Sequence, residues 1–409
     1  MKRAQLEAHL LVLVTLALVA FGLVMVYSAT SAPAAIGNGD PSSYLKRQAA
    51  YAVVGFALLL FFSRTSYRAL RRLAPTFVAA ALVLCVAVLV LGPQVNGARR
   101  WLTFGPATFQ PSELAKLALA VWAAAFLARK TPGDLRSLVR PLGVLVGLFC
   151  GLLLLEPDLG TAITIVVMVG VMLAVGGVPL RLLAGGTAIV VALGLGAIWI
   201  EPYRRERIFS FLNPWDDSQG SGFQTVQAMI GLGSGGPFGV GLGQGVQKIF
   251  YLPEAHTDMI LAVVGEELGL LGTAAVITGF AVFAWTALSI ALACRDPFGK
   301  NLAVGLTALV CGQAAINLAA VLGLAPLTGI PLPFVSYGGS NLVVALASVG
   351  VLLNIASNGA RERAPMRDRE RRDGRPRAAL ARGGGGAALA RRAGDVRRVA
   401  GSRRSAAGP

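Results

Sequence analysis

Several titratable side chains lie close together just before an apolar stretch of the sequence. Glu254, His256 and Asp258 put three such groups within five residues, immediately ahead of a long hydrophobic block. Removal from water raises the pKa of a carboxyl group, whereas a nearby cation lowers it. A carboxylate balanced between these effects can act as a general base near neutral pH, and Asp258 is our candidate for that base. The alternative is that Asp258 only caps the following helix.

Cationic side chains that could bind an anionic group occur in two other segments. Arg100 precedes a segment in which Pro111 is expected to start a helix, with Glu113 and Lys116 three residues apart on one face. One hypothesis is that Arg100 and Lys116 offer positive charge to an anionic headgroup. The alternative is a helix cap with an ion pair between Glu113 and Lys116. Arg204 opens a further arginine cluster at 204–207.

Two more segments combine turn residues with polar groups. Glu156 and Asp158 flank a proline in a short turn between apolar blocks, and Asp158 is expected to cap the helix that follows. Ser336 and Ser340 open the last apolar block together with two glycines. Backbone N–H groups at such a helix start can bind an anion, although an ordinary cap with close helix packing explains the same residues.

The sequence gives little support for a nucleotide-binding site or for a metal site built of protein side chains. Eight glycines lie in 231–245, and three of them match a dinucleotide-binding fingerprint by letters alone. No strand precedes them, so we reject that interpretation and expect the glycines to let backbone approach the bilayer or a ligand. The only two histidines, His9 and His256, exclude a cage built of histidines, and the four cysteines show no paired spacing. We therefore expect no resident cofactor.

The elements that position these groups are apolar helices. Of 409 residues, 55% are hydrophobic and only 14% are charged, against roughly 25% charged in soluble proteins. The apolar blocks approach the roughly 20 residues a helix needs to cross a bilayer, and they lack the alternation of a barrel. The sequence predicts an all-α integral membrane protein with about ten transmembrane helices, at 9–29, 48–62, 75–92, 112–128, 138–155, 159–176, 183–200, 262–293, 301–323 and 337–356.

The positive charge of the short loops predicts the orientation. With a cytoplasmic N-terminus, the inside loops carry eleven Lys and Arg residues and the short outside loops carry four. Both termini are then cytoplasmic, and the large loop 201–257 between helices 7 and 8 is extracytoplasmic. All the candidate segments above touch the outer face in this topology.

The C-terminal residues differ in composition from the rest. Residues 357–409 hold 15 Arg against 5 Asp and Glu, with many Gly and Ala and no apolar periodicity. We predict a membrane domain over 1–357 and a disordered Arg/Gly-rich cytoplasmic tail over 358–409. Such a tail beside a membrane helix is expected to attract anionic membrane lipids rather than nucleic acid.

Seven short motifs follow one another in a fixed order, at 97–101, 110–116, 156–160, 243–248, 251–258, 265–269 and 336–340. Together they resemble the SEDS family of cell-wall polymerases, whose members include FtsW, RodA and SpoVE. The resemblance spans residues 9 to about 357. The 251–258 motif is more similar to FtsW or SpoVE than to RodA. Met259 and Asn341 depart from the family pattern, but neither change removes an ionisable group.

The resemblance implies a peptidoglycan glycosyltransferase of the bacterial cytoplasmic membrane, acting at the division septum with its active site facing outward. It would polymerise lipid II into β-1,4 glycan strands in one inverting step. Asp258 would be the general base, and undecaprenyl pyrophosphate would leave. The implied substrate-binding residues are Lys116, Arg100, Glu113, Arg204, Glu254, His256, Ser336 and Ser340.

The same resemblance implies partners and leaves alternatives open. A class B penicillin-binding protein, which cross-links glycan strands, and other divisome membrane proteins are the expected partners. A divalent cation, Mg²⁺ or Mn²⁺, could bridge the pyrophosphate to a carboxylate. The alternatives are a RodA-like elongation polymerase, a lipid II flippase and a scaffold. Charged motifs gathered towards one face, without an inverted repeat, favour a polymerase over a transporter.

Overall fold

In the computed structural model of the protein, the described residues are 2–37, 39–95, 97–105, 107–129, 135–249 and 251–363. Each of the ten predicted blocks matches one helix, with no more than two residues of a block outside it. These helices are α1 (Lys2–Ile36), α2 (Ser43–Arg64), α3 (Arg68–Leu91), α4 (Pro111–Leu127), α5 (Leu135–Leu155), α6 (Leu159–Val175), α7 (Leu180–Ile200), α10 (Ile260–Ala293), α11 (Pro297–Val321) and α12 (Gly339–Arg363).

The predicted class, a helical integral membrane protein, is confirmed. Within the described residues, seven helices are long and apolar enough to cross a membrane, namely α1, α2, α3, α7, α10, α11 and α12. The apolar parts of α5 and α6 are shorter, and α4 contains two buried charged side chains, Glu113 and Lys116. The number of ten crossings stays a prediction. Helix α12 continues to Arg363, past the predicted boundary at 357, and the predicted tail beyond it lies outside the described residues.

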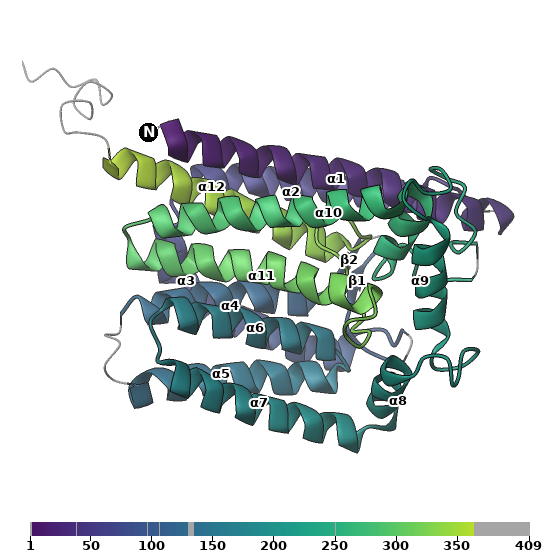
Figure 1. Ribbon diagram of the computed structural model, residues 1–409. Helices are drawn as coiled ribbons and strands as arrows, with labels where there is room; N and C mark the ends of the chain where they lie inside the picture. Colours follow the sequence, from purple (N-terminus) through teal and green to yellow (C-terminus); the bar gives the residue numbers. More distant parts are fainter. Residues whose placement is uncertain are drawn as a thin grey trace, which may run out of the picture. The chain divides into compact units, whose positions relative to one another are not determined.

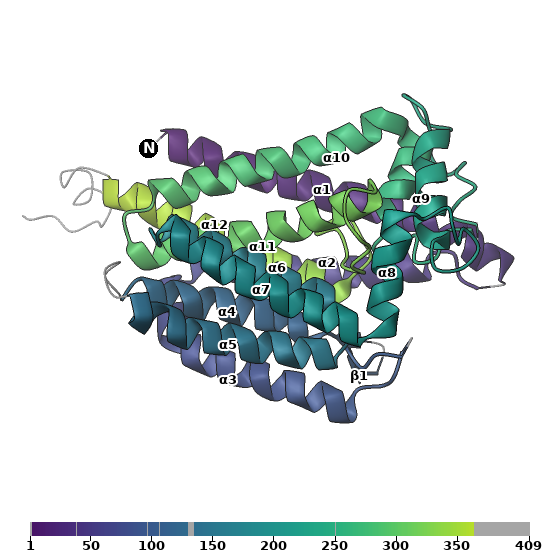
Figure 2. The same cartoon turned by 60° about the horizontal axis from the view of Figure 1, so that its bottom comes forward.

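The connections contain structure that the apolar pattern does not predict. The loop 201–257 includes α8 (Pro202–Leu212) and α9 (Phe223–Ser234). An antiparallel hairpin of β1 (Leu102–Phe104) and β2 (Ala107–Phe109) precedes α4, so the chain is not strictly all-α. Helices α8 and α9 and the hairpin lie at the same end of the long helices, where α9 runs across them (Figure 1); the turned view agrees (Figure 2).

Helix α11 lies at the centre of the packing around the candidate site. It contacts α4, α6, α10 and α12, and most of its residues are buried. Helix α4 is buried almost throughout as well. By contrast, α7 has no buried residue and contacts α6 and α8. The polar residues of α4 and α11 are therefore enclosed by protein, where side-chain partners can replace water.

The glycine-rich stretch packs against a break in α10. Gly269 has a φ of 66°, which interrupts the helix and frees main-chain groups on both sides. The N–H groups of Val240 and Gly241 donate to the carbonyls of Glu266 and Glu267, each at 3.0 Å. A Cβ added at Gly239 would lie 2.2 Å from the carbonyl oxygen of Glu267. Gly239 thus permits a close approach to the α10 backbone, and the predicted approach of this stretch to the bilayer or a ligand stays a prediction.

The predicted orientation can be tested with inserted tags. We expect a tag after Lys2 to be cytoplasmic and one near the exposed Gly220 to be extracytoplasmic, because the loops expected inside carry most of the Lys and Arg. Labelling with a membrane-impermeant reagent in intact and permeabilised cells measures both. Labelling of the Lys2 tag in intact cells would invert the proposed topology.

Candidate functional site

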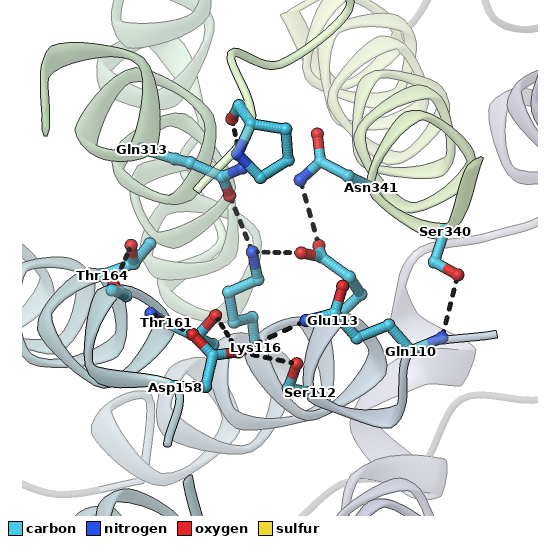
Figure 3. Close-up of polar contacts among 12 residues, drawn as sticks. Gln110, Ser112, Glu113, Lys116, Asp158, Thr161, Thr164, Gln313, Ser340 and Asn341 are labelled. Carbon is cyan, nitrogen blue, oxygen red and sulfur yellow. Dashed lines mark hydrogen bonds and ion pairs between the residues drawn. The ribbon is translucent and has the colours of Figure 1, made fainter. Parts of the chain in front are cut away.

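A buried charged cluster lies at the second turn of α4. The ammonium of Lys116 donates to Glu113 Oε1 at 2.9 Å and to Gln313 Oε1 at 2.7 Å. Asn341 Nδ2 donates to the other carboxylate oxygen of Glu113 at 3.1 Å. Figure 3 shows Lys116 pointing between Glu113 and Gln313, with Asn341 beyond Glu113. The predicted ion pair between Glu113 and Lys116 is therefore present.

The burial of this pair determines what it can contact. Lys116 is 1% exposed and Glu113 is 2% exposed. Two buried opposite charges are tolerated only where hydrogen bonds replace the lost water, and the amides of Gln313 and Asn341 supply them here. The Lys116 ammonium lies away from any open surface, so its direct contact with an anionic substrate stays a prediction. The sequence signal for Gln313 is an amide side chain inside the apolar block 301–323, and the sequence alone did not single it out as a site residue.

The serines that open α12 are engaged within the protein. Ser340 Oγ accepts a hydrogen bond from the main-chain N–H of Gln110 at 3.0 Å, which joins α12 to the residue before α4 (Figure 3). Ser336 Oγ accepts one from the N–H of Leu332 at 2.8 Å. The Ser336 hydroxyl thus stabilises the chain before α12, and the Ser340 hydroxyl holds the residue before α4. Anion binding by Ser336 and Ser340 stays a prediction.

Asp258 lies two residues before α10, ahead of Met259 at the N-cap position, and is 9% exposed. Its main-chain carbonyl accepts a hydrogen bond from Asn317 Nδ2 at 2.8 Å. Burial raises the pKa of the Asp258 carboxyl to about 6; the negative charge of Glu254 adds to the increase and the positive charge of Arg207 opposes it. A Cβ added at Gly329 would lie 4.0 Å from both Arg207 Nη1 and Asp258 Oδ2. The carboxylate and the guanidinium therefore face one small space.

The two other titratable groups of this motif flank Asp258. Glu254 is exposed, and its carboxylate accepts a hydrogen bond from Thr257 Oγ1 at 3.0 Å. The His256 ring packs against Tyr44 at 4.8 Å and Tyr337 at 5.5 Å between ring centroids. Burial lowers the pKa of His256, which favours a neutral imidazole near neutral pH. His256 is thus placed to donate or accept hydrogen bonds rather than to supply charge.

Arg100 binds the turn between α5 and α6. Its guanidinium donates to the main-chain carbonyl of Glu156 at 3.1 Å and to that of Pro157. The Glu156 side chain is fully buried, and burial, with the charge of Asp158, raises its pKa to about 8. Asp158 caps α6 by accepting from the N–H of Thr161 at 3.1 Å, which confirms the predicted cap.

The same turn packs against the chain that faces Asp258. A Cβ added at Gly160 would lie 2.5 Å from Ile330 Cγ2 and 2.8 Å from the carbonyl oxygen of Thr328. Gly329, between these two residues, faces Asp258. The 156–160 motif therefore supports one side of the segment whose other side borders the candidate base.

The arginine cluster of the long loop forms part of α8. The side chain of Arg204 lies outside the described part of the structure, so its predicted role is untested. Arg207 Nη1 donates to the carbonyl of Leu327 at 3.0 Å. Arg207 follows Arg204 by three residues in the sequence of α8. Helical spacing within the cluster was the only sequence signal that could have singled out Arg207.

The fold and this site define a multi-pass helical membrane protein that brings the buried Asp258 carboxylate close to Arg207, an arginine of the 201–257 loop. The family model described as "Cell cycle protein", covering FtsW, RodA and SpoVE, matches residues 8–361. The chain belongs to this family.

Curated relatives match most of the chain. A probable peptidoglycan glycosyltransferase FtsW of Trichlorobacter lovleyi is 41% identical over 351 residues, which are 85% of this chain and 92% of the relative. Stage V sporulation protein E of Bacillus subtilis is 40% identical over 352 residues, 85% of this chain and 96% of that protein.

Solved structures show the same fold. One, described as "Structural coordination of polymerization and crosslinking by a peptidoglycan synthase complex", is 33% identical, with a TM-score of 0.72 over 85% of this chain and 97% of that one. The rod shape determining protein RodA of Thermus thermophilus is 31% identical, with a TM-score of 0.64 over 85% of this chain and 96% of that one. The predicted membership of the family is confirmed.

Proposed function

We propose that this protein is a peptidoglycan glycosyltransferase that polymerises lipid II for the septal wall of dividing cells. Family membership and relatives named as peptidoglycan glycosyltransferases support the reaction class. The observation that carries the mechanism is Asp258, a buried carboxylate with a raised pKa that faces the same small space as Arg207. A buried base beside a fixed cation suits a reaction that removes a proton and releases an anion.

The chemistry is one displacement. Asp258 takes the proton of the acceptor GlcNAc 4-hydroxyl while that oxygen bonds to the anomeric carbon of the donor. The bond from this carbon to the undecaprenyl pyrophosphate breaks, and its electron pair leaves with the diphosphate. Attack opposite the leaving group converts an α-linked donor into a β-1,4 linkage without a covalent enzyme intermediate. Catalysis then rests on one base and on accurate positioning.

The leaving diphosphate needs positive charge. Arg207 lies beside Asp258, and Arg100 lies at the α5–α6 turn that supports the same segment. We assign both to the diphosphate, together with Arg204 from α8. Among the described residues no group of three or more His, Cys, Asp or Glu side chains is arranged to hold a metal ion. A Mg²⁺ or Mn²⁺ ion would therefore bind chiefly to the diphosphate, with the exposed Glu254 as its protein ligand.

The remaining candidates would orient the sugars. His256 flanks Asp258 and is held by two tyrosines, so it can hydrogen-bond an acceptor hydroxyl. Ser336 shapes the chain before α12, Ser340 holds the residue before α4, and Glu113 holds Lys116. We assign these residues to the substrate-binding region.

We place the reaction at the outer face of the cytoplasmic membrane, at the division septum, with a class B penicillin-binding protein as the partner and other divisome proteins nearby. The similar structure described as a peptidoglycan synthase complex that coordinates polymerisation and crosslinking supports such a partner. Helices α10 and α11, within 262–323, are our docking surface, because a single-span partner needs lipid-facing helix surface. The exposed apolar side chains there, such as Leu271, Trp285 and Leu292, belong to α10.

The decisive experiment is polymerisation of purified lipid II by the purified protein, alone and with a class B penicillin-binding protein. We expect glycan strands that a muramidase digests. Transport of lipid II across vesicles without polymer would support the flippase instead. Depletion in cells separates the branches: filaments indicate a division enzyme, whereas rounded cells indicate a RodA-like elongation enzyme.

The raised pKa of Asp258 predicts how the rate depends on pH. The base must be ionised to accept a proton, and burial raises its pKa to about 6. We expect kcat/KM for polymerisation to be nearly constant above pH 7 and to fall tenfold per pH unit well below 6, since the protonated fraction then dominates. Initial rates between pH 4.5 and 8.5 measure this. An acid limb near 4, the range of an ordinary carboxyl, would contradict a buried base.

A further inference from the structure

The segment 327–331 lies within the connection between α11 and α12 and has no regular secondary structure, and side chains from separate elements hold its main chain. Arg207 Nη1 donates to the carbonyl of Leu327 at 3.0 Å. Asn317 Nδ2 donates to that of Ile330 at 2.9 Å, and Gln313 Nε2 donates to that of Pro331 at 2.9 Å. An irregular segment inside a membrane protein needs such partners for its main chain.

The two amides lie on one face of α11. Gln313 and Asn317 are four residues apart, and each is 2% exposed. Besides Ile330, Asn317 Nδ2 donates to the main-chain carbonyl of Asp258 at 2.8 Å. Both hydrogens of this NH2 group are therefore used, and they tie the 327–331 segment to the residue that we assign as the base.

The Lys116 ammonium fixes the orientation of the Gln313 amide. An ammonium can only donate, so Gln313 must present its oxygen to Lys116, which lies 2.7 Å away. The NH2 end is then directed at the carbonyl of Pro331. Glu113 balances the charge of Lys116 from the same helix. A continuous set of hydrogen bonds thus leads from the Glu113–Lys116 pair to the 327–331 segment (Figure 3).

The segment borders the space in which we place the chemistry. Gly329 has a φ of 71°, and a Cβ there would contact Asp258 Oδ2 and Arg207 Nη1 at 4.0 Å. The main chain at Gly329 therefore forms a wall of this space. A shift of the segment would change both the shape of the space and the separation of the base from Arg207, and a shift of about 1 Å can cost ~100-fold in rate.

We propose that Gln313 and Asn317 are positioning residues for Asp258, and that Lys116 acts on the reaction through Gln313 rather than by touching the diphosphate. This proposal rests on the proposed function. It assigns the buried ion pair of α4 a role that fits its 1% and 2% exposure. It also explains why polar amides occupy an otherwise apolar helix, since their hydrogen bonds hold the irregular segment 327–331 beside Asp258, the residue assigned as the base.

The first test replaces each amide by leucine, in the complex with the class B penicillin-binding protein. We expect Asn317→Leu and Gln313→Leu to lower kcat by ~10–100-fold, because the base is misplaced, with the KM for lipid II within about twofold of wild type, because neither amide touches substrate. The matched control is Thr307→Val on the same helix, which removes a buried hydroxyl bonded to the carbonyl of Ala303. It is expected to polymerise at the wild-type rate.

The pH profile separates positioning from general destabilisation. If Asn317→Leu lets Asp258 move away from Arg207, the cation lowers the pKa of the base less, and the acid limb shifts above pH 6. A variant that is only less stable has a lower polymerisation rate at every pH, and the pH at which the rate falls on the acid side does not change. Thermal midpoints in detergent identify any variant that fails to fold, and the other amide then carries the test.

A double-mutant cycle tests the role of Lys116. If Lys116 acts through Gln313, the variant with both Lys116→Met and Gln313→Leu is about as slow as the slower single variant. Losses that multiply would show that Lys116 contacts the substrate directly, and would overturn its assigned route. Wild-type turnover by folded Asn317→Leu and Gln313→Leu would overturn the positioning role. Failure of the wild-type protein to polymerise lipid II would instead remove the proposed function.

Discussion

Replacement of Asp258 by asparagine is expected to slow lipid II polymerisation by at least ~100-fold, the usual range for the loss of a general base. Asparagine has nearly the same size and keeps most hydrogen bonding, but it has no basic oxygen. The main-chain carbonyl at this position can still accept from Asn317, so the loop is expected to keep its place. A neutral amide is also easier to bury than a carboxylate, so the thermal midpoint should not fall.

Glu254→Gln is the matched control for this variant. It removes a carboxylate four residues away that is exposed and shares the Thr257 hydroxyl with Asp258. We expect a loss of less than ~10-fold, consistent with an orienting or metal-bridging part. Polymerisation by purified proteins and binding of the partner are measured on the same preparations. Normal turnover by well-folded Asp258→Asn would exclude this base and return the flippase to consideration.

The long helices were predictable because one physical constraint fixes them. The bilayer sets both the length and the composition of a spanning segment, and each of the ten blocks accordingly has no more than two residues outside its helix, although several helices extend further. The hairpin at 102–109 and helices α8 and α9 lie in connections, where no such constraint acts. They are short elements stabilised by tertiary contacts, such as the bond between the N–H of Thr108 and the hydroxyl of Tyr51.

The candidate site was predictable only where its contacts are local in sequence. The Glu113–Lys116 pair and the Asp158 cap span three residues each, and both are present. The contacts of Gln313 and Asn317 span 197 and 59 residues. The packing of helices decides such long-range contacts, and a single sequence considered alone carries no signal for them.

Arg100 illustrates the same limit. Its charge and its place beside a membrane boundary predicted an anion-binding group. The structure adds that the guanidinium holds two main-chain carbonyls at the α5–α6 turn. An arginine has five N–H donors, so it can hold this turn and still present donors to a diphosphate. Its charge was visible in the sequence, whereas its partners depended on how the loops fold together.

A second buried ion pair holds the glycine-rich stretch. Lys248 Nζ lies 2.6 Å from Glu267 Oε1, and both side chains are at most 1% exposed. Ser28 of α1 donates to the same carboxylate, at 2.7 and 2.8 Å to its two oxygens, and accepts from Lys248 at 3.1 Å. The ammonium also donates to the carbonyl of Gly243 at 2.9 Å. The pair therefore ties the loop to α1 and α10.

Lys248→Met is expected to destabilise the protein by ~3–5 kcal/mol, the usual cost of removing one partner of a buried ion pair. Methionine fills much of the space of lysine, so the loss comes from leaving the Glu267 carboxylate buried without its cation, with the Ser28 hydroxyl as its remaining side-chain donor among the described residues. Unfolding in mild detergent, followed by intrinsic fluorescence against denaturant, measures the change. Lys248→Met combined with Glu267→Leu removes both charges, and we expect it to recover most of the loss. If the double variant were as unstable as the single one, the cost would lie in lost packing of the loop and not in an uncompensated charge.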